Sequence, residues 1–289
     1  MPSPLLTAAL WATGSAGAFA ASSAAAKFLG QKLPVAELAC FRALFGALLL
    51  AGAWRIGVTL GRPSDLWGYV LRCGLGVMAL YSLMYAFTTI PLALASLLFI
   101  SRILLMPVAG RLMLGERSSP LVWAAVVVGF LGATLPLAPA LAIPEQRLGV
   151  LAALIAAAAS AGSQTAVRRL ARSNSAGMIT LIYAGASVAA TLPVALIDWV
   201  APPMTDWPVL AALGLFAMLA QLTAAKAYRL APVGVLAPFD VLSVPAAAAA
   251  GYLLFGEIPG LLTVLGSAVI LAATVAATRD RPQDEIAPR

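Results

Sequence analysis

Long apolar stretches alternate with short polar breaks along nearly the whole chain. Each stretch is about 20 residues long, the length that an α-helix needs to cross the ~30 Å hydrocarbon core of a bilayer. Backbone groups in lipid must be satisfied within each segment, and the alternation typical of barrel strands is missing, so helices are predicted. The predicted spans cover residues 5–28, 35–54, 67–87, 91–113, 120–139, 148–171, 177–199, 207–229, 232–254 and 260–278.

Composition strengthens this prediction and limits what else the chain can contain. Of the 289 residues, 62% are hydrophobic and 10% are charged, with a mean hydropathy of +0.97. A soluble domain carries roughly 25% charged residues. We therefore predict an all-α membrane protein of ten transmembrane helices with no sizeable soluble domain. The first stretch is also similar to a signal peptide, but it lacks a basic start and is long enough to span the membrane, so it is retained as a helix.

The basic residues divide unevenly between the two sides of the predicted bundle. Cytoplasmic loops of membrane proteins carry an excess of Lys and Arg. With the N-terminus inside, thirteen fall on the cytoplasmic side: Arg55, Arg62, Arg72, Arg111, Arg117, Arg168, Arg169, Arg172, Lys226, Arg229, Arg279, Arg281 and Arg289. Three fall on the other side: Lys27, Lys32 and Arg147. We predict a multi-pass protein of a bacterial inner (plasma) membrane with both termini cytoplasmic.

The chain also repeats itself at a constant interval, which we call the repeat offset. A shift of 141 residues places Ala86-Phe87 on Ala227-Tyr228, Pro91 on Pro232, and Gly115-Glu116 on Gly256-Glu257. Each half holds five predicted helices, and because five is odd the second half must enter the membrane in the opposite sense. Inverted repeats are typical of secondary transporters, which bind substrate between the halves. The predicted division is 1–140, 141–278 and a cytoplasmic tail, 279–289.

The two equivalent segments, Pro91 through Glu116 and Pro232 through Glu257, resemble the EamA-type drug/metabolite transporter superfamily. In that family a helix that begins with Pro ends in a Gly-Glu corner, and a helix containing Gly follows. Further matching positions are Gly129, Gly132, Gly266 and Arg42. The resemblance implies ten helices in two inverted bundles, a central cavity and alternating access. It leaves the substrate open among amino acids, sugars, nucleotide derivatives, amines and vitamins.

Two charged residues inside predicted spans are the first candidates for substrate binding. A charge near the bilayer centre is unfavourable by roughly 2.5–3.5 kcal/mol on insertion scales. Arg102 and Asp240 lie in the two equivalent helices and could face one cavity. Arg102 would then bind an anionic group, and Asp240 would receive an amine or a coupling proton. The alternative is a buried salt bridge that only holds the bundle together.

Three other charged residues are interpreted as structural. Arg42 is expected to snorkel outward and to pair with Glu37 on the same helix. Glu116 and Glu257 end the two equivalent helices, where carboxylates satisfy the N-termini of neighbouring helices. Together with Pro91 and Pro232 these residues form the structural motif of the prediction.

Aromatic and polar side chains within the spans could line the cavity. The substrate-binding candidates of this kind are Trp11, Tyr81, Tyr85, Phe99, Gln164 and Tyr183. Such walls suit an amphiphilic ligand, although most aromatic residues in helical bundles serve packing or interface anchoring. Pro107, Pro238 and Pro245 could mark kinks or tolerated bends.

The remaining features exclude several classes of function. The basic residues form no patch, so nucleic acid is not an expected partner. Cys40 and Cys73 lie in apolar segments and are interpreted as packing residues, and the absence of His removes the commonest metal ligand. We expect no metal, no cofactor and no catalysis; the expected partners are the lipid bilayer, a small-molecule substrate and protons. The predicted function is secondary transport of a small amphiphilic or zwitterionic, amino-acid-like metabolite by an exporter or exchanger; an uptake carrier for a nucleoside- or vitamin-like molecule, a channel and an intramembrane enzyme are the alternatives.

Overall fold

The computed structural model describes residues 4–54, 64–116, 119–230 and 239–279, and these residues form helices joined by turns, without a strand among them. Five of the described helical segments are long and apolar enough to cross a membrane by length and composition. The helices are α1 Pro4–Leu29, α2 Val35–Trp54, α3 Leu66–Thr89, α4 Leu92–Ile100, α5 Arg102–Leu114, α6 Pro120–Thr134, α7 Leu137–Ala142, α8 Pro144–Leu170, α9 Ala176–Ala195, α10 Trp207–Leu230, α12 Ser243–Phe255 and α13 Leu261–Arg279.

Most predicted spans correspond to one helix, but the span predicted at 91–113 is divided. It consists of α4 and α5, which meet at Ser101. The Ser101 Oγ donates to the Leu98 carbonyl oxygen at 2.6 Å. Such a bond from a side chain to the backbone of its own helix competes with the backbone hydrogen bonds of that helix. The predicted span 120–139 is likewise divided into α6 and α7. Part of the predicted span 232–254, including Pro232 and Pro238, lies outside the described residues.

The break in the fourth predicted helix has a counterpart in the ninth. The repeat offset carries Ser101 onto Leu242, which precedes α12 with φ −61° and ψ −17°, and Ser101 has φ −58° and ψ −13°. Pro245 accounts for the break at Leu242, because a proline has no N–H to donate to the Val241 carbonyl four residues earlier. Transporters use discontinuous helices of this kind near their substrate sites.

The ends of these two helices also have the same backbone conformation. Gly115 follows α5 with φ 68°, and Gly256 follows α12 with φ 67°; both lie in the left-handed region that glycine tolerates best. The N–H of Glu116 donates to the Gly110 carbonyl at 3.2 Å, and that of Glu257 to the Gly251 carbonyl at 3.1 Å. The predicted pair of Gly-Glu corners is therefore present in matching geometry.

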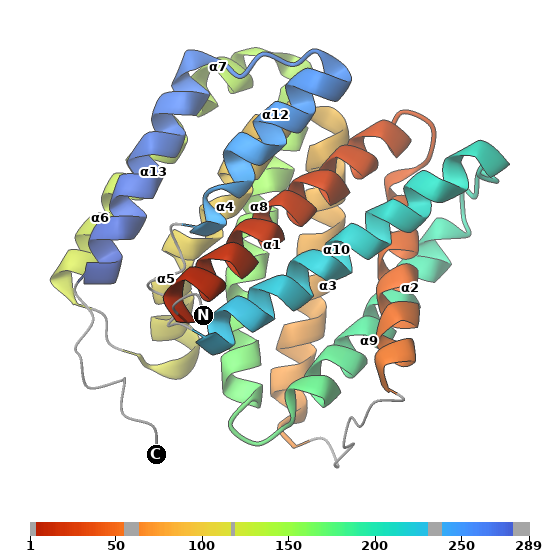
Figure 1. Cartoon of the computed structure of the whole chain (residues 1–289), viewed down its shortest axis with the longest axis horizontal. Helices are drawn as coiled ribbons and strands as arrows, with labels where there is room; N and C mark the ends of the chain where they lie inside the picture. The colour runs from red at the N-terminus through yellow and green to blue at the C-terminus, as the bar shows by residue number, and fades with distance from the viewer. Residues whose placement is uncertain (1–3, 55–63, 117–118, 231–238, 280–289) are drawn as a thin grey trace.

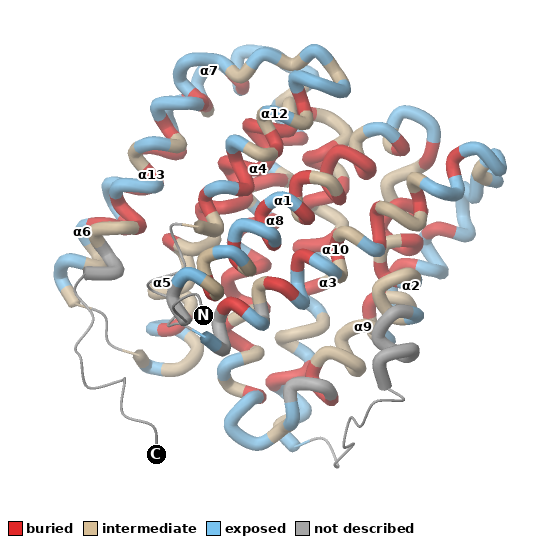
Figure 2. The backbone as a smooth tube through the Cα atoms, viewed as in Figure 1, coloured by how far each residue is buried: buried red, intermediate tan, exposed pale blue. Residues whose placement is uncertain are grey.

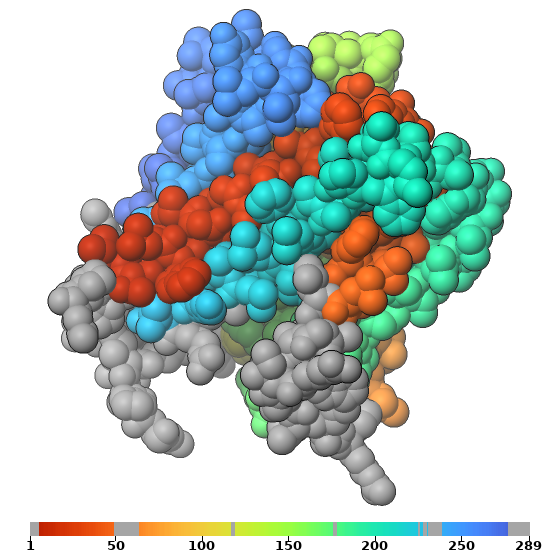
Figure 3. Space-filling model, turned by 45° about the vertical axis from the view of Figure 1, so that its right-hand side comes forward, coloured from red at the N-terminus to blue at the C-terminus, as the bar shows by residue number. Residues whose placement is uncertain are grey.

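Helix packing follows the same correspondence. The two most extensive contacts join α3 to α8 and α1 to α10, and a shift by five predicted helices turns one of these pairs into the other. Figure 1 and Figure 3 show α1 and α10 side by side across one face of the molecule. The pairs α2 with α9, α4 with α12 and α6 with α13 each join a helix to its own counterpart. Each of these contacts joins a helix of one half to a helix of the other, as is expected when two related halves pack together.

Small residues allow the peripheral pair α6 and α13 to approach closely. A Cβ atom at Gly266 would lie 2.5 Å from the Gly132 carbonyl oxygen, so a side chain does not fit there. Close approach through small residues is a common way for membrane helices to associate. Figure 2 shows that α6, α7 and α13 carry many exposed positions, whereas buried positions concentrate on inner helices such as α4.

Candidate functional site

At one end of the helical bundle, an ion pair joins α1 to the corner after α12. Lys27 Nζ pairs with Glu257 Oε1, and the two side chains are 13% and 20% exposed. Lys27 also donates to the Ile90 carbonyl oxygen at 2.9 Å. The second Glu257 oxygen accepts the Leu92 N–H at 2.9 Å, at the first residue of α4. This corner carboxylate therefore joins three helices, including the N-terminus that the sequence analysis expected such a residue to satisfy.

The equivalent pair lies at the opposite end. Arg168 of α8 lies 3.1 Å from the Glu116 carboxylate at the corner after α5, with side chains 48% and 37% exposed. The repeat offset carries Lys27 onto Arg168 and Glu116 onto Glu257. Each half of the chain thus supplies the cation of one pair and the carboxylate of the other.

A second ion pair accompanies each of the first two. Arg169 contacts the Asp65 carboxylate through two nitrogens, Nε to Oδ2 at 2.5 Å and Nη2 to Oδ1 at 3.0 Å. Lys32 Nζ donates to both oxygens of Asp206, at 2.8 and 3.0 Å. Asp65 and Asp206 are again related by the repeat offset, and they directly precede α3 and α10.

We name these two groups by their cations. The Lys27 latch comprises Lys27, Lys32, Asp206 and Glu257, and the Arg168 latch comprises Asp65, Glu116, Arg168 and Arg169. All four ion pairs found among the described residues belong to these latches. Helices α1 and α8 end on opposite sides of the molecule in Figure 1, so the two latches lie at opposite ends of the bundle.

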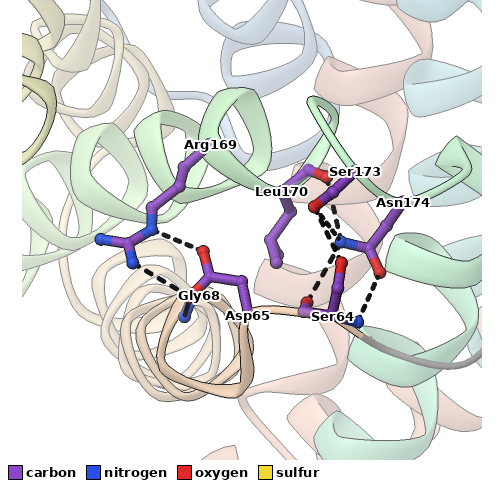
Figure 4. A network of polar contacts seen from close by, with 7 residues as sticks. All are labelled: Ser64, Asp65, Gly68, Arg169, Leu170, Ser173 and Asn174. Carbon is purple, nitrogen blue, oxygen red and sulfur yellow. Dashed lines mark hydrogen bonds and ion pairs between the residues drawn. The ribbon is translucent and has the colours of Figure 1, made fainter.

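The Arg168 latch continues into a hydrogen-bond network, which Figure 4 shows from close by. Asp65 caps α3 by accepting the Gly68 N–H at 3.1 Å. The Arg169 guanidinium, assisted by this N–H, holds the pKa of Asp65 below its usual range against the opposing effect of partial burial. Asn174 accepts the Ser64 N–H at 3.1 Å and donates to the Ser64 carbonyl at 3.2 Å. The loop before α3 is therefore fixed to the end of α8.

Between the latches, an arginine of α3 lies against a tyrosine of α9. The Arg72 guanidinium carbon is 3.8 Å from the centre of the Tyr183 ring, which is a cation–π stack. Arg72 Nη1 donates to Ser163 Oγ at 2.6 Å, and that hydroxyl donates to the Arg72 carbonyl at 2.9 Å. The Tyr183 hydroxyl donates to the Gly76 carbonyl at 3.3 Å. Helices α3, α8 and α9 together position this arginine.

Arg42 of α2 does not form the expected ion pair with Glu37, although the structure describes both residues. Glu37 instead accepts the Val200 N–H at 2.5 Å. The physical reason is helical geometry: residues five apart at 3.6 residues per turn are separated by about 140° around the axis. Arg42 and Glu37 therefore face different neighbours. We name Arg72, Ser163 and Tyr183 the arginine cluster.

Arg102 and Asp240, the first candidates of the sequence analysis, flank the two helix breaks. Arg102 begins α5 and lies over the Phe99 ring at 4.5 Å, and Phe99 stacks on Phe19 at 5.6 Å between ring centres. The two charges do not form an ion pair with each other, although the structure describes both residues. Their direct use in substrate or proton binding stays a prediction.

The other candidate residues occupy separate places in the bundle. Trp11 lies under the Lys226 ammonium, 4.4 Å from the ring centre. The Tyr81 hydroxyl is 3.4 Å from the Thr191 carbonyl. Tyr85 and Gln164 are half-buried, and Gln164 directly follows Ser163 of the arginine cluster. Of the predicted group, the structure brings Tyr183 to the arginine cluster and Phe99 to Arg102.

An apolar pocket of about 280 Å³ lies in the described part of the chain. It lies among α4, α12 and α13 and contacts none of the predicted substrate-binding residues. Its lining includes Ala93, Val244, Pro245, Thr263, Ser267 and Leu271. Among the described residues, no group of three His, Cys, Asp or Glu side chains could hold a metal ion.

Sequence reasoning missed the role of Arg72 and the partners in the latches. It counted Arg72 on the cytoplasmic side of the membrane, although this residue falls inside the predicted span 67–87; a charge within a span was the available signal. The repeat offset, applied to Lys27 and to Asp65, leads to Arg168 and Asp206. The repeat offset was therefore present in the sequence, but it was applied only to the Gly-Glu corners at Glu116 and Glu257.

Comparison with known proteins gives one family and several full-length relatives. The model of the EamA-like transporter family matches residues 6–137 and 147–279. The pseudopaline exporter CntI of Pseudomonas aeruginosa is 27% identical over 265 residues, covering 91% of this chain and 93% of that protein. A riboflavin transporter of Rhizobium johnstonii is 29% identical, with coverage of 99% and 96%. An S-adenosylmethionine uptake transporter of Rickettsia felis is 28% identical, with coverage of 93% and 92%.

A solved crystal structure has the same fold. It superposes with a TM-score of 0.68 at 20% identity and covers 94% of this chain and 96% of its own chain. At this identity the likeness concerns the fold alone.

Proposed function

The chain belongs to the EamA-like transporter family, a family of ten-helix membrane transporters rather than enzymes, and from this premise we propose that it carries a small amphiphilic or zwitterionic, amino-acid-like metabolite across a bacterial inner membrane by alternating access. In this proposal the halves 1–140 and 141–278 are inverted repeats, and the protein works as an exporter or exchanger. The relatives support the coarser statement of transport; substrate and direction belong to the proposal.

The observation that carries the proposal is the pair of equivalent latches at opposite ends of the bundle. Each latch joins the end of α1 or α8 to a Gly-Glu corner contributed by the other half. When one half rocks against the other, one latch separates while the other stays closed, so the central site opens to one side at a time. A channel would need no such exchange of closures.

The expected strength of the latches is suited to this task. A partly exposed ion pair contributes about 0.2–1 kcal/mol, and a more buried one contributes more. Two pairs at each end can therefore bias the equilibrium between two conformations by a few kcal/mol, and substrate binding of similar free energy can reverse the bias. Much stronger closures would hold the carrier in a single state.

Within the site, we propose that Arg102 and Asp240 act at the helix breaks. Discontinuous helices in transporters expose backbone dipoles toward substrates and coupling ions. Asp240 would bind a coupling proton or an amine, and Arg102 an anionic group. Partners are then the lipid bilayer, the substrate and protons, and the proposed topology keeps both termini cytoplasmic.

Reconstitution into liposomes tests the proposal. The proteoliposomes are loaded with a panel of amino acids, amines, nucleosides and vitamins, and counterflow is measured with and without a pH gradient. Saturable counterflow of at least one metabolite supports a carrier, and flux without saturation or counterflow contradicts it. Asp240→Asn should abolish the effect of the pH gradient while counterflow persists. Unchanged proton dependence in this variant would remove Asp240 from the coupling role.

The names of the relatives favour one second candidate, which is uptake of a larger nucleoside- or vitamin-like molecule. Two of the matched proteins are named as a riboflavin transporter and an S-adenosylmethionine uptake transporter. The same liposome panel separates the two candidates, because it contains both classes of substrate.

A further inference from the structure

We infer that the arginine cluster is a second anion-binding site, distinct from Arg102, that receives a carboxylate or another anionic group of the transported molecule. This inference rests on the proposed transport function and assigns a substrate class to it. Arg72 supplies the charge, and Tyr183 and Ser163 position its guanidinium. The inference adds Arg42 of α2 as a second cation.

The depth of the two arginines places them between the latches. Helices α2 and α3 are consecutive and antiparallel, so they begin at opposite ends of the bundle. Arg42 lies seven residues after the start of α2, and Arg72 lies six residues after the start of α3. At 1.5 Å per residue, each is about 10 Å from its own end of a ~30 Å core. Both arginines therefore lie about a third of the way into the membrane, from opposite sides.

Neither arginine has a carboxylate partner among the described residues. The four ion pairs of this part of the chain are those of the latches, and none of them includes Arg42 or Arg72. Glu37, on the same helix as Arg42, accepts the Val200 N–H instead. Two cations within the helices α2 and α3 are thus left without a carboxylate counter-ion from the described part of the protein.

The donor capacity of the cluster is largely unused. A guanidinium carries five N–H donors, and Arg72 uses one of its nitrogens to bond Ser163. Its Nε is buried and has no hydrogen-bond partner in the described structure. A buried donor left unsatisfied is unfavourable by about 1–3 kcal/mol. An anion bound here would accept hydrogen bonds from Arg72 and supply the missing counter-ion.

The surroundings of Arg72 fix it in a position to bind. The Tyr183 ring stacks on one face of the guanidinium, and a Cβ atom at Gly76 would contact the same ring, so α3 and α9 are tightly packed there. Ser163 holds one edge of the guanidinium. Both arginines are only half-buried, so each retains accessible surface. A preoriented planar fork of this kind recognises carboxylates better than a mobile ammonium does.

Binding of simple anions tests the site directly. Thermal unfolding of the purified protein in detergent is measured with potassium phosphate, succinate or citrate against potassium chloride at constant ionic strength. At least one of the three oxyanions should raise the unfolding midpoint of the wild type above its value in chloride. Arg42→Gln and Arg72→Gln should weaken that binding about tenfold to hundredfold, since each removes charge-assisted hydrogen bonds. The exposed Arg111→Gln is the matched control and should bind as the wild type does.

Arg72→Lys and Arg42→Lys keep the test decisive if a glutamine variant does not fold. They retain the charge without the planar fork, so they should bind more weakly than the wild type. Equal stabilisation by all four salts, or oxyanion binding that survives substitution at both arginine positions, overturns the inference.

Transport measurements separate this inference from the proposed function. In liposomes, carboxylate-bearing members of the metabolite panel should exchange faster than matched amides, and Arg42→Gln and Arg72→Gln should remove the preference. Counterflow of amides and carboxylates at equal rates would overturn the anion site and leave the transporter intact. If no metabolite is transported, the proposed function fails, and the salt experiment alone decides whether the anion site exists.

Discussion

Replacing Glu257 by Gln should destabilise the protein much more than the equivalent replacement of Glu116. Glutamine keeps an acceptor for the Leu92 N–H but cannot neutralise Lys27. Lys27 and Glu257 are 13% and 20% exposed, whereas Arg168 and Glu116 are 48% and 37% exposed. The same chemical change therefore removes a largely buried ion pair in one variant and a largely solvated pair in the other.

The expected magnitudes follow from this difference in exposure. Removing one partner of a buried pair destabilises by about 3–5 kcal/mol, and the residual exposure of Lys27 and Glu257 reduces the expectation to about 2–3 kcal/mol. A solvent-exposed pair contributes about 0.2–1 kcal/mol, so about 0.5 kcal/mol is expected for Glu116→Gln. The two variants should differ by about 2 kcal/mol.

Thermal unfolding in one detergent, followed by loss of the monodisperse peak in size-exclusion chromatography, measures the difference. The double variant Lys27→Glu with Glu257→Lys restores opposite charges and should recover part of the lost stability. Equal midpoints for Glu257→Gln and Glu116→Gln, or a lower midpoint for Glu116→Gln, would refute the reasoning from burial.

Two further predictions concern helix packing and pH. Gly266→Ala should destabilise by about 1–3 kcal/mol, because its methyl group would overlap the Gly132 carbonyl and force α6 and α13 apart; thermal unfolding checks this, and an unchanged midpoint would contradict the close packing. Asp65→Asn should lower stability at neutral pH. The pKa of Asp65 is depressed by Arg169 in the folded protein, so its stabilising effect is complete above the unfolded pKa of about 3.9 and is lost as pH falls through the folded value. Unfolding midpoints of wild type and variant between pH 7 and pH 3 should therefore converge toward acid, and a constant difference would be evidence against the ion pair.

The helices could be predicted from the sequence because burial in lipid leaves a strong one-dimensional signal. Runs of apolar residues located α1, α2, α3 and α9 to within a few residues. The breaks at Ser101 and Leu242 could not be located in this way. Hydropathy is continuous across both positions. A serine hydroxyl that donates to a carbonyl of its own helix, or a proline within a span, leaves the apolar pattern unchanged.

The candidate site was harder to predict because it depends on contacts between distant segments. The repeat offset identified the corners at Glu116 and Glu257, but their partners follow only when the same offset is combined with the packing of α1 and α8. Arg72 was counted among the charges of the cytoplasmic side, since its place near the start of a span gives no indication of the Tyr183 ring. Helical periodicity, in contrast, was sufficient to argue against the pairing of Arg42 with Glu37.

Distances across the two latches test the central claim of alternating closure most directly. In a variant with Cys40 and Cys73 replaced by Ala, spin labels at Phe28 and Ile258 report on the Lys27 latch, and labels at Leu112 and Arg172 in a second sample report on the Arg168 latch. Pulsed dipolar spectroscopy in lipid nanodiscs gives both distance distributions with and without Glu257→Gln. We expect this substitution to lengthen the distance at the Lys27 latch and to reduce the open population at the Arg168 latch. Simultaneous lengthening at both ends would contradict alternating access.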